Sequence, residues 1–207
     1  MALEKTSFEA LKAYIPDGSF DGVIAIIQAH KVHLIVTKER QTKLGDFRNA
    51  YMGKNHRISV NGNLNKFAFL ITLLHELAHL LAYDRFGFQI AVHGKEWKHQ
   101  FGILLHDFLS KNILPEDISR ELAATIHNPA ATTSGEEKLQ RILKKYDKQK
   151  TGFDFIENLS SGTFFMFRKK TYQVGERLRK RILCVEISSG KGYLFSPICE
   201  VKLLSYL

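Results

Sequence analysis

The segment 75-HELAH-79 places two histidines and a glutamate at helical spacing inside the apolar run 67–83. Positions i and i+4 of a helix lie on one face, so the imidazoles of His75 and His79 can reach one metal ion. Glu76 can lie beside that ion without binding it, where its carboxylate can pass a proton from water to a leaving amine. Zinc lowers the pKa of bound water toward ~7, so these residues suit amide hydrolysis at neutral pH.

A catalytic zinc site has three protein ligands and one open position, so a third ligand is needed. The compact HExxHxxGxxH arrangement is absent from this helix. His93 follows the helix break at Gly87 and begins the next predicted helix, 94–110. If that helix returns antiparallel to the first, its N-terminus points at the metal. His93 is therefore the predicted third ligand, and Glu96 and His99 are its competitors.

A chance match is the alternative to a metal site, because HExxH occurs on many helices and buried histidines are often only hydrogen-bonded. Here the three polar side chains lie in an apolar helix predicted over 65–85. Burying them without partners costs several kcal/mol, and a bound metal removes that cost. The sequence therefore predicts a Zn2+ site with the ligands His75, His79 and His93 and with Glu76 as the catalytic residue.

The elements around the motif predict an α+β fold. Before the motif the pattern indicates helices at 3–14 and 20–30 and then strands at 32–39, 41–53 and 54–62. The last two strands are joined by a turn at Gly53, and the strands are expected to form a small antiparallel sheet. Asn63 or Asn65 is expected to cap the motif helix.

The motif and its continuation, HELAH followed by a loop and HGKEW, resemble the pattern of the SprT-like metalloproteases, the family that includes Spartan. The pattern HExxH, a spacer and HGxxW is matched by His75, Glu76, His79, His93, Gly94 and Trp97. The upstream segment with Leu44-Gly45 is also similar, so the resemblance covers roughly residues 5–110.

This resemblance implies a zincin-like domain that hydrolyses peptide bonds in protein substrates. It also implies three zinc-binding histidines, with Glu76 as general base. Within the family, Spartan degrades proteins crosslinked to DNA. A DNA-associated protein substrate is therefore an expectation that the resemblance adds.

The composition changes at 127–137, where Pro, Ala, Thr, Ser and Gly predominate. This segment is predicted to link a metalloprotease domain, 1–126, to a smaller unit, 138–207, with a basic helix and a β unit. The β unit resembles the zinc ribbon of SprT-like proteins in its order of strands and glycine turns, but it has no CxxC motif. An apolar core is expected to replace the metal, made of Phe164, Phe165, Phe167, Leu183, Val185, Tyr193 and Phe195. Cys184 and Cys199 are expected to be packing residues.

The chain is basic, with 30 Lys and Arg against 21 Asp and Glu, which favours an anionic partner. The run 168-RKKTYQVGERLRKR-181 has seven basic residues and one acid. Phosphate contacts and stacking on Tyr172 predict a nucleic-acid surface, and a solvated strand face is the alternative. The residues assigned to DNA are Arg168, Lys169, Lys170, Arg177, Arg179, Lys180 and Arg181. A basic helix face is expected to add Lys138, Arg141, Lys144, Lys145 and Lys148.

Two cysteines cannot build a disulfide framework, and the first residues have no apolar segment typical of a signal peptide. A cytoplasmic protein that does not enter the membrane is therefore predicted. The rival to the enzyme is a catalytically weak binding module, in which zinc holds the helices together and the basic tail binds nucleic acid. A third option is a zinc hydrolase that acts on something other than protein. Glu76 favours the enzyme, because a purely structural zinc site does not need a carboxylate there.

Overall fold

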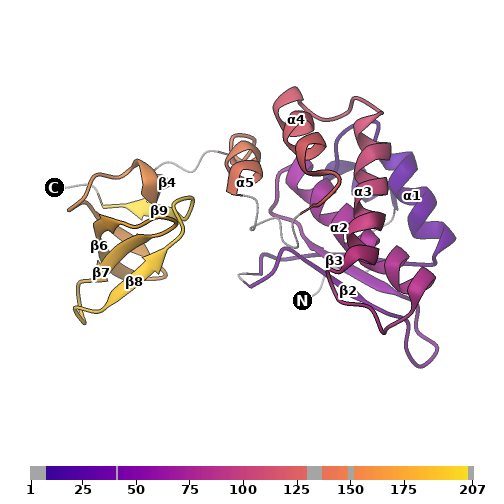
Figure 1. Cartoon of the computed structure of the whole chain (residues 1–207), viewed down its shortest axis with the longest axis horizontal. Coiled ribbons are helices and arrows are strands. Elements are labelled where there is room, and N and C mark those ends of the chain that lie inside the picture. The colour runs from indigo at the N-terminus through magenta and orange to yellow at the C-terminus, as the bar shows by residue number, and fades with distance from the viewer. Residues whose placement is uncertain (1–7, 41, 130–136, 149–151, 205–207) are drawn as a thin grey trace. The chain divides into compact units, whose positions relative to one another are not determined.

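The protein has an α+β fold that divides into two compact units, Met1–Asp147 and Lys148–Leu207, here the N-terminal and C-terminal units. The computed structural model is shown in Figure 1. The structure describes residues 8–40, 42–129, 137–148 and 152–204.

The division falls later in the chain than the predicted linker at 127–137, most of which lies outside the described residues. Helix α5 (Glu137–Lys144) was expected in the C-terminal unit but belongs to the N-terminal one, because Leu139 and Leu143 are buried in its core. The side chain of Asn65 also donates hydrogen bonds to the Leu143 carbonyl at 2.9 Å and to Asp147 at 2.6 Å. The predicted boundary is therefore corrected to the segment after Asp147.

The sheet of the N-terminal unit has three strands, β1 (His33–Thr37), β2 (Gly45–Arg48) and β3 (Arg57–Asn61). Strand β3 lies in the centre, parallel to β1 and antiparallel to β2, so the prediction of an antiparallel sheet is wrong for one pair. The connection from β1 to β2 crosses to the far edge of the sheet. Arg40 holds it there by donating to Ser59 at 2.9 Å and Asn61 at 2.8 Å.

The two faces of this sheet differ because side chains alternate along a strand. The inner face is apolar and packs against the helices, through Leu34, Val36, Ile58 and Val60. The outer face is polar and carries His33, Arg57, Ser59 and Asp46, among others. Figure 1 shows the helices gathered on one side of the strands.

A short 3-10 helix, η1 (Phe8–Ala13), and four α-helices before α5 complete the N-terminal unit. The α-helices are α1 (Phe20–Ala29), α2 (Lys66–Phe86), α3 (Lys95–Leu109) and α4 (Glu116–Thr125). Helix α2 packs against both α3 and the sheet, so it is the central element of the unit. By length and composition, α2 is the one described helix that could cross a membrane. Of its apolar window, 67% is buried inside the protein, and a core helix passes the same test.

The ends of α2 follow the sequence signals. The side chain of Asn65 accepts hydrogen bonds from the backbone N–H of Phe67 and Ala68, as expected for an N-cap. Gly87 ends the helix with a φ of 76°, a backbone conformation that favours glycine. Helix α3 then returns along α2 and buries its predicted apolar face, made of Trp97, Phe101, Leu104, Leu105 and Phe108.

The C-terminal unit is an antiparallel sheet with the strand order β4-β9-β5-β6-β7-β8. Its strands are β4 (Phe153–Phe155), β5 (Phe164–Phe167), β6 (Lys170–Arg177), β7 (Ile182–Glu186), β8 (Gly192–Phe195) and β9 (Glu200–Leu203). A 3-10 turn, η3 (Ile156–Asn158), follows β4. Phe165 and Phe195 lie in its buried core, as predicted.

Strand β7 presents the face opposite to the predicted one. Ile182, Cys184 and Glu186 point inward, whereas Leu183 and Val185 are only half-buried. The prediction failed because both faces of ILCVE hold apolar residues, so alternation alone does not choose between them. Three other expected core residues also lie outside the buried core: Phe164 and Phe167 are half-buried and Tyr193 is exposed. Cys184 is fully buried, and Cys199 packs beside the core, as expected for packing cysteines.

Candidate metal centre

Three imidazole nitrogens converge on one point of the N-terminal unit. The Nε2 atoms of His75 and His79 lie 3.3 Å apart, and that of His93 lies 3.2 Å from the first and 3.1 Å from the second. Nitrogen ligands about 2.0 Å from a tetrahedral zinc ion lie roughly 3.3 Å from one another. The donor type and the spacing therefore fit Zn2+, and the three residues are the one such cluster within the described chain.

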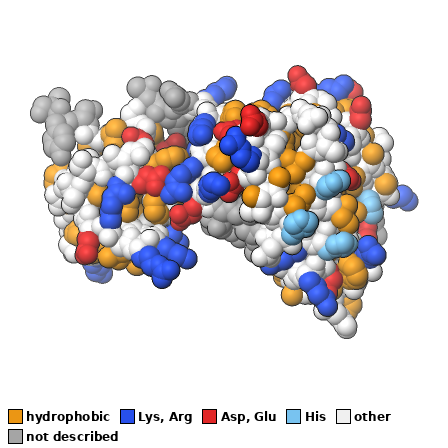
Figure 2. Space-filling view, turned by 45° about the horizontal axis from the view of Figure 1, so that its top comes forward, with side chains coloured by type: hydrophobic (Ala, Val, Ile, Leu, Met, Phe, Trp, Pro, Cys, Tyr) orange, Lys and Arg blue, Asp and Glu red, His pale blue; other side chains and the backbone are white. Residues whose placement is uncertain are grey.

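Helix α2 and the loop before α3 bring these ligands together. His75 and His79 are one turn apart on α2, and His93 comes from the turn that follows Gly87. The backbone N–H of Gly94 donates to the Ala91 carbonyl at 2.9 Å, which closes that turn. All three imidazoles are half-buried, so one side of the cluster faces solvent. Figure 2 shows histidines (pale blue) at the surface of this unit.

Aromatic side chains fix the orientation of the ligands. The ring centroid of Trp97 lies 4.6 Å from that of His75, 5.4 Å from that of His79 and 4.7 Å from that of His93. Its Nε1–H donates to the carbonyl of His75 at 3.3 Å, and the side chain is fully buried. Phe47 of β2 stacks on His79 from another side, with an interplanar angle of 5°. The rings are therefore held in place by the fold.

Burial keeps the ligands neutral. Together with the neighbouring imidazoles, which contribute less, burial lowers the pKa of His75 to about 3 and that of His79 to about 4. The pKa of His93 is lowered by burial as well. Neutral imidazole is the form that binds metal, so the cluster needs no deprotonation at pH 7.

Glu76 lies beside the histidines and is buried, but its carboxylate is not part of the ligand cluster. Burial, and to a smaller extent the charge of Asp46, raises its pKa to about 8. Arg40, Lys43 and a hydrogen bond from the backbone N–H of Phe47 act in the opposite direction. A carboxyl group with its pKa near neutrality can both accept and release a proton.

The first residue of β2 makes room for this carboxylate. A Cβ atom at Gly45 would lie 2.3 Å from Oε1 of Glu76, which is far closer than van der Waals contact allows. Strand β2 therefore positions Glu76 in two ways. Gly45 leaves room for the carboxylate, and the backbone N–H of Phe47 donates a hydrogen bond to it. Local sequence patterns predicted no role for Gly45 or Phe47, because their position in the sheet depends on long-range pairing.

The competing ligands lie elsewhere. His99 and His106 are on α3, where they line a separate shallow pocket with residues of α4. Glu96 is in the first turn of α3 and is not part of the ligand cluster. The three predicted histidines therefore lie together, and the alternative ligands on α3 lie outside their cluster.

The basic run 168–181 does not form one surface. Arg168 and Lys169 form the turn between β5 and β6, whereas residues 178–181 connect the other end of β6 to β7. The eight residues of β6 separate these groups by roughly 26 Å at about 3.3 Å per residue. The prediction that Tyr172 stacks on bases is wrong, because its ring is buried and stacks on Phe165 in the core.

Several basic residues assigned to nucleic acid are paired with acids instead. Lys170 contacts both carboxylate oxygens of the buried Glu186 at 3.0 Å. On α5, Lys138 pairs with Glu121, Lys144 with Asp147 and Lys145 with Asp117. DNA binding by this part of the chain stays a prediction, with fewer available charges than the sequence suggested.

Comparisons with protein-family models, curated proteins and solved structures found no match to this chain. Its function is therefore argued from the chemistry of the histidine cluster and Glu76.

Proposed function

We propose that this protein is a zinc-dependent metalloendopeptidase of the SprT-like type. The observation that carries the proposal is the convergence of three Nε2 atoms within 3.1–3.3 Å of one another, with Glu76 beside them. Three histidine ligands leave a fourth position open, which is typical of catalytic zinc. The resemblance of HELAH and HGKEW to SprT-like proteases supports the same function and a zincin-like domain.

The residues of the chain have distinct tasks in this reaction. Bound zinc would supply a Lewis acid that polarises the scissile carbonyl and activates water. His75, His79 and His93 would hold the ion. The positive charge of a bound ion would favour the ionised form of Glu76, in which its carboxylate accepts a proton from the attacking water and then gives it to the leaving amine.

The surroundings of the cluster favour an extended polypeptide as substrate. Strand β2 is at the edge of its sheet and carries Phe47 and Gly45, which contact Glu76 and the ligands. A free strand edge can pair with an extended peptide through main-chain hydrogen bonds. Apolar side chains in the loop before His93 are also exposed, Phe88 to 78% and Val92 to 69%. They suit the apolar side chains of an unfolded segment.

The test is a comparison of the zinc-loaded protein with its Glu76→Gln variant. We expect about one zinc per chain in both proteins and cleavage of casein by the wild type alone, with a loss of about 10²–10⁴-fold in the variant. Metal content is measured by elemental analysis and cleavage by gel electrophoresis. Loss of zinc from the variant would show that Glu76 is a ligand. A zinc-loaded wild type that cleaves neither casein nor a DNA-bound protein would favour the rival binding module.

A further inference from the structure

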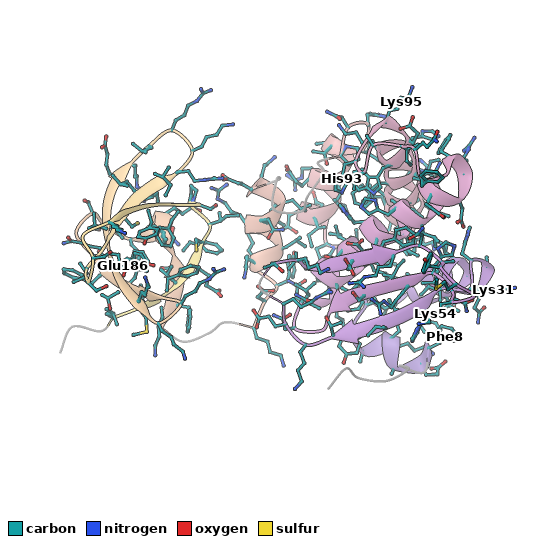
Figure 3. All side chains as sticks on the ribbon, turned by 90° about the horizontal axis from the view of Figure 1, so that it is seen from below. Phe8, Lys31, Lys54, His93, Lys95 and Glu186 are labelled. Carbon is teal, nitrogen blue, oxygen red and sulfur yellow. The ribbon has the colours of Figure 1, made fainter. Side chains whose placement is uncertain are left out.

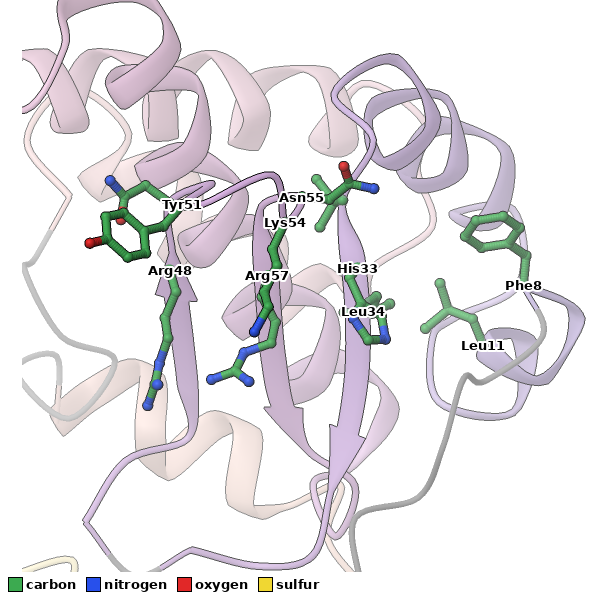
Figure 4. Close-up of a pocket in the computed structure, with 11 residues that line it drawn as sticks. Phe8, Leu11, His33, Leu34, Arg48, Tyr51, Lys54, Asn55 and Arg57 are labelled. Carbon is green, nitrogen blue, oxygen red and sulfur yellow. The ribbon is translucent and has the colours of Figure 1, made fainter.

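A second site lies at the end of the N-terminal sheet where β1 and β3 begin and β2 ends, and no residue of α2 lines it. It is an open pocket of about 900 Å³ between η1, the beginning of β1 and the hairpin that joins β2 to β3. Figure 4 shows its lining side chains in front of the strands. This volume is within the range of small-molecule sites. The lining includes Arg48, Lys54 and Arg57 and has no carboxylate, so we call it the cationic pocket.

The floor of the cationic pocket holds two neighbouring arginines with a histidine beside them. The register pairs His33 with Arg57 and Arg57 with Arg48, so the three side chains lie next to one another across the sheet. Like charges directly opposite in neighbouring strands destabilise a sheet. Two adjacent arginines therefore have a cost in the free protein, and an anionic ligand would remove it.

The charges in the pocket are only partly neutralised. Arg48 donates to Asp46 at 3.1 Å, but that carboxylate also contacts Lys43 at 2.6 Å. Within the described residues no ion pair is found for Arg57 or Lys54. An anion entering the pocket would therefore meet at least two uncompensated cations.

The hairpin that carries Lys54 is ordered. Tyr51 and Lys54 exchange backbone hydrogen bonds at 3.3 and 3.0 Å across a two-residue turn. Met52 and Gly53 occupy that turn with φ values of 48° and 74°. Figure 3 also places Lys54 and Phe8 well away from His93 of the metal centre. The pocket is thus held in shape without the residues of the metal centre.

Aromatic and apolar side chains flank the charges. Tyr51 stands at one end of the pocket with 70% of its surface exposed, and Phe8 stands at the other with 44% exposed. Figure 4 shows Lys54 and Arg57 between these two rings and Arg48 on the side of Tyr51. Leu11, Val32 and Leu34 complete an apolar wall next to Phe8. A ligand that fills this pocket would carry an anionic group for the centre and a flat or apolar group for one end.

We infer that the cationic pocket binds the phosphate and base of a nucleotide, either free or as part of a single strand of nucleic acid. Guanidinium groups bind phosphate through paired, charge-assisted hydrogen bonds, and exposed aromatic rings stack on bases. The inference does not depend on the peptidase function, because the pocket shares no residue with the metal centre.

The test measures binding of ATP by titration calorimetry and of a fluorescein-labelled oligothymidylate by anisotropy, with the full chain. We expect saturable binding of at least one of them. Arg57→Gln and Lys54→Gln should each weaken it about tenfold, as expected for one charge-assisted hydrogen bond. Binding of ATP assigns the pocket to free nucleotides, and binding of the oligonucleotide alone assigns it to a strand.

Two matched controls make the test specific. Arg120→Gln removes one positive charge from an exposed pair on α4, and Arg179→Gln removes one from the C-terminal unit. Both should leave affinity unchanged. The inference would be overturned if Arg57→Gln and Arg120→Gln weakened binding equally, or if Arg179→Gln alone weakened it. It would also be overturned if neither ligand bound.

Stability supplies a second readout. Relief of the repulsion between Arg48 and Arg57 should leave the Tm of ligand-free Arg57→Gln equal to that of the wild type or higher. A variant that loses both Tm and affinity would identify Arg57 as a structural residue, and the inference would then fail.

Discussion

Each unit of this protein buries a glutamate, but the two carboxylates have very different surroundings. In the C-terminal unit (Figure 3), Glu186 accepts hydrogen bonds from Lys170 at 3.0 Å and Ser188 at 2.6 Å. In the N-terminal unit, Glu76 has one backbone hydrogen bond and lies beside three half-buried histidines. Ser188, Lys170 and Tyr193 lower the pKa of Glu186 to about 2, whereas burial raises that of Glu76 to about 8.

The difference separates a structural polar group from one arranged for chemistry. A buried charge whose partners are all within the chain stabilises the fold or is neutral to it. A buried group without enough partners costs free energy, so it persists where it has a function. Glu186 is therefore a structural group, and Glu76 with its histidines is a group arranged for chemistry.

The largest effect is expected from loss of a zinc ligand, which tests whether the N-terminal cluster needs an external partner. His93→Ala should weaken zinc binding by more than about 100-fold, the upper range for loss of a residue that only supports a ligand. His99→Ala and His106→Ala are matched controls on α3 and should retain zinc. Affinity is measured by competition with a chelator. Zinc loss in His99→Ala but not in His93→Ala would contradict the assigned cluster.

The next effect tests how Glu76 is positioned. Gly45→Ala places a methyl group 2.3 Å from Oε1 of Glu76, so the carboxylate must move. We expect kcat to fall by about 100-fold with zinc still bound, since a displacement of 1 Å costs about that much. Gly22→Ala is the control, because its 2.3 Å contact is with the flexible end of Lys111. Equal activity of both variants would mean that Glu76 tolerates the shift.

A smaller effect is expected in the apolar core of the C-terminal unit. Cys184→Ser introduces a hydroxyl group at a fully buried site and should lower the free energy of unfolding by about 1–3 kcal/mol. Cys199→Ser, at a half-buried site, should cost less. Denaturant unfolding followed by tyrosine fluorescence measures both. In the native protein, the Cys184 thiol should resist alkylation, because burial raises its pKa and blocks access.

The smallest effect is a pH dependence of the C-terminal unit. Because the pKa of Glu186 is lowered to about 2 in the folded state, its contribution is present above the unfolded value of about 4.3. It is lost as the pH falls from there toward 2. The protection of β6 and β7 amides from hydrogen exchange, relative to their intrinsic exchange rates, should therefore fall over this range in the wild type. Glu186→Gln should show less of this pH dependence, and the exposed Glu176→Gln should behave like the wild type. An unchanged profile in Glu186→Gln would assign the acid response to other groups.

Local periodicity in the sequence was sufficient to predict the features of the site that depend on helices α2 and α3. The i, i+4 spacing of His75 and His79, the Asn65 cap and the Gly87 break each depend on backbone geometry within a few residues. The apolar face of α3 follows from the same 3.6-residue repeat, so its return along α2 was predictable. This is why the expected ligands and the grouping of residues in the structure agree.

Only the tertiary structure decided the features that depend on strand pairing. Gly45 and Phe47 reach Glu76, and Arg48 lies beside Arg57, because β2 crosses to the far edge of β3. Strand register and parallel pairing arise from contacts between distant segments, which local patterns do not encode. The same reason explains the reversed face of β7 and the place of α5. The sequence determined which residues could bind a metal, and the sheet decided which residues surround them.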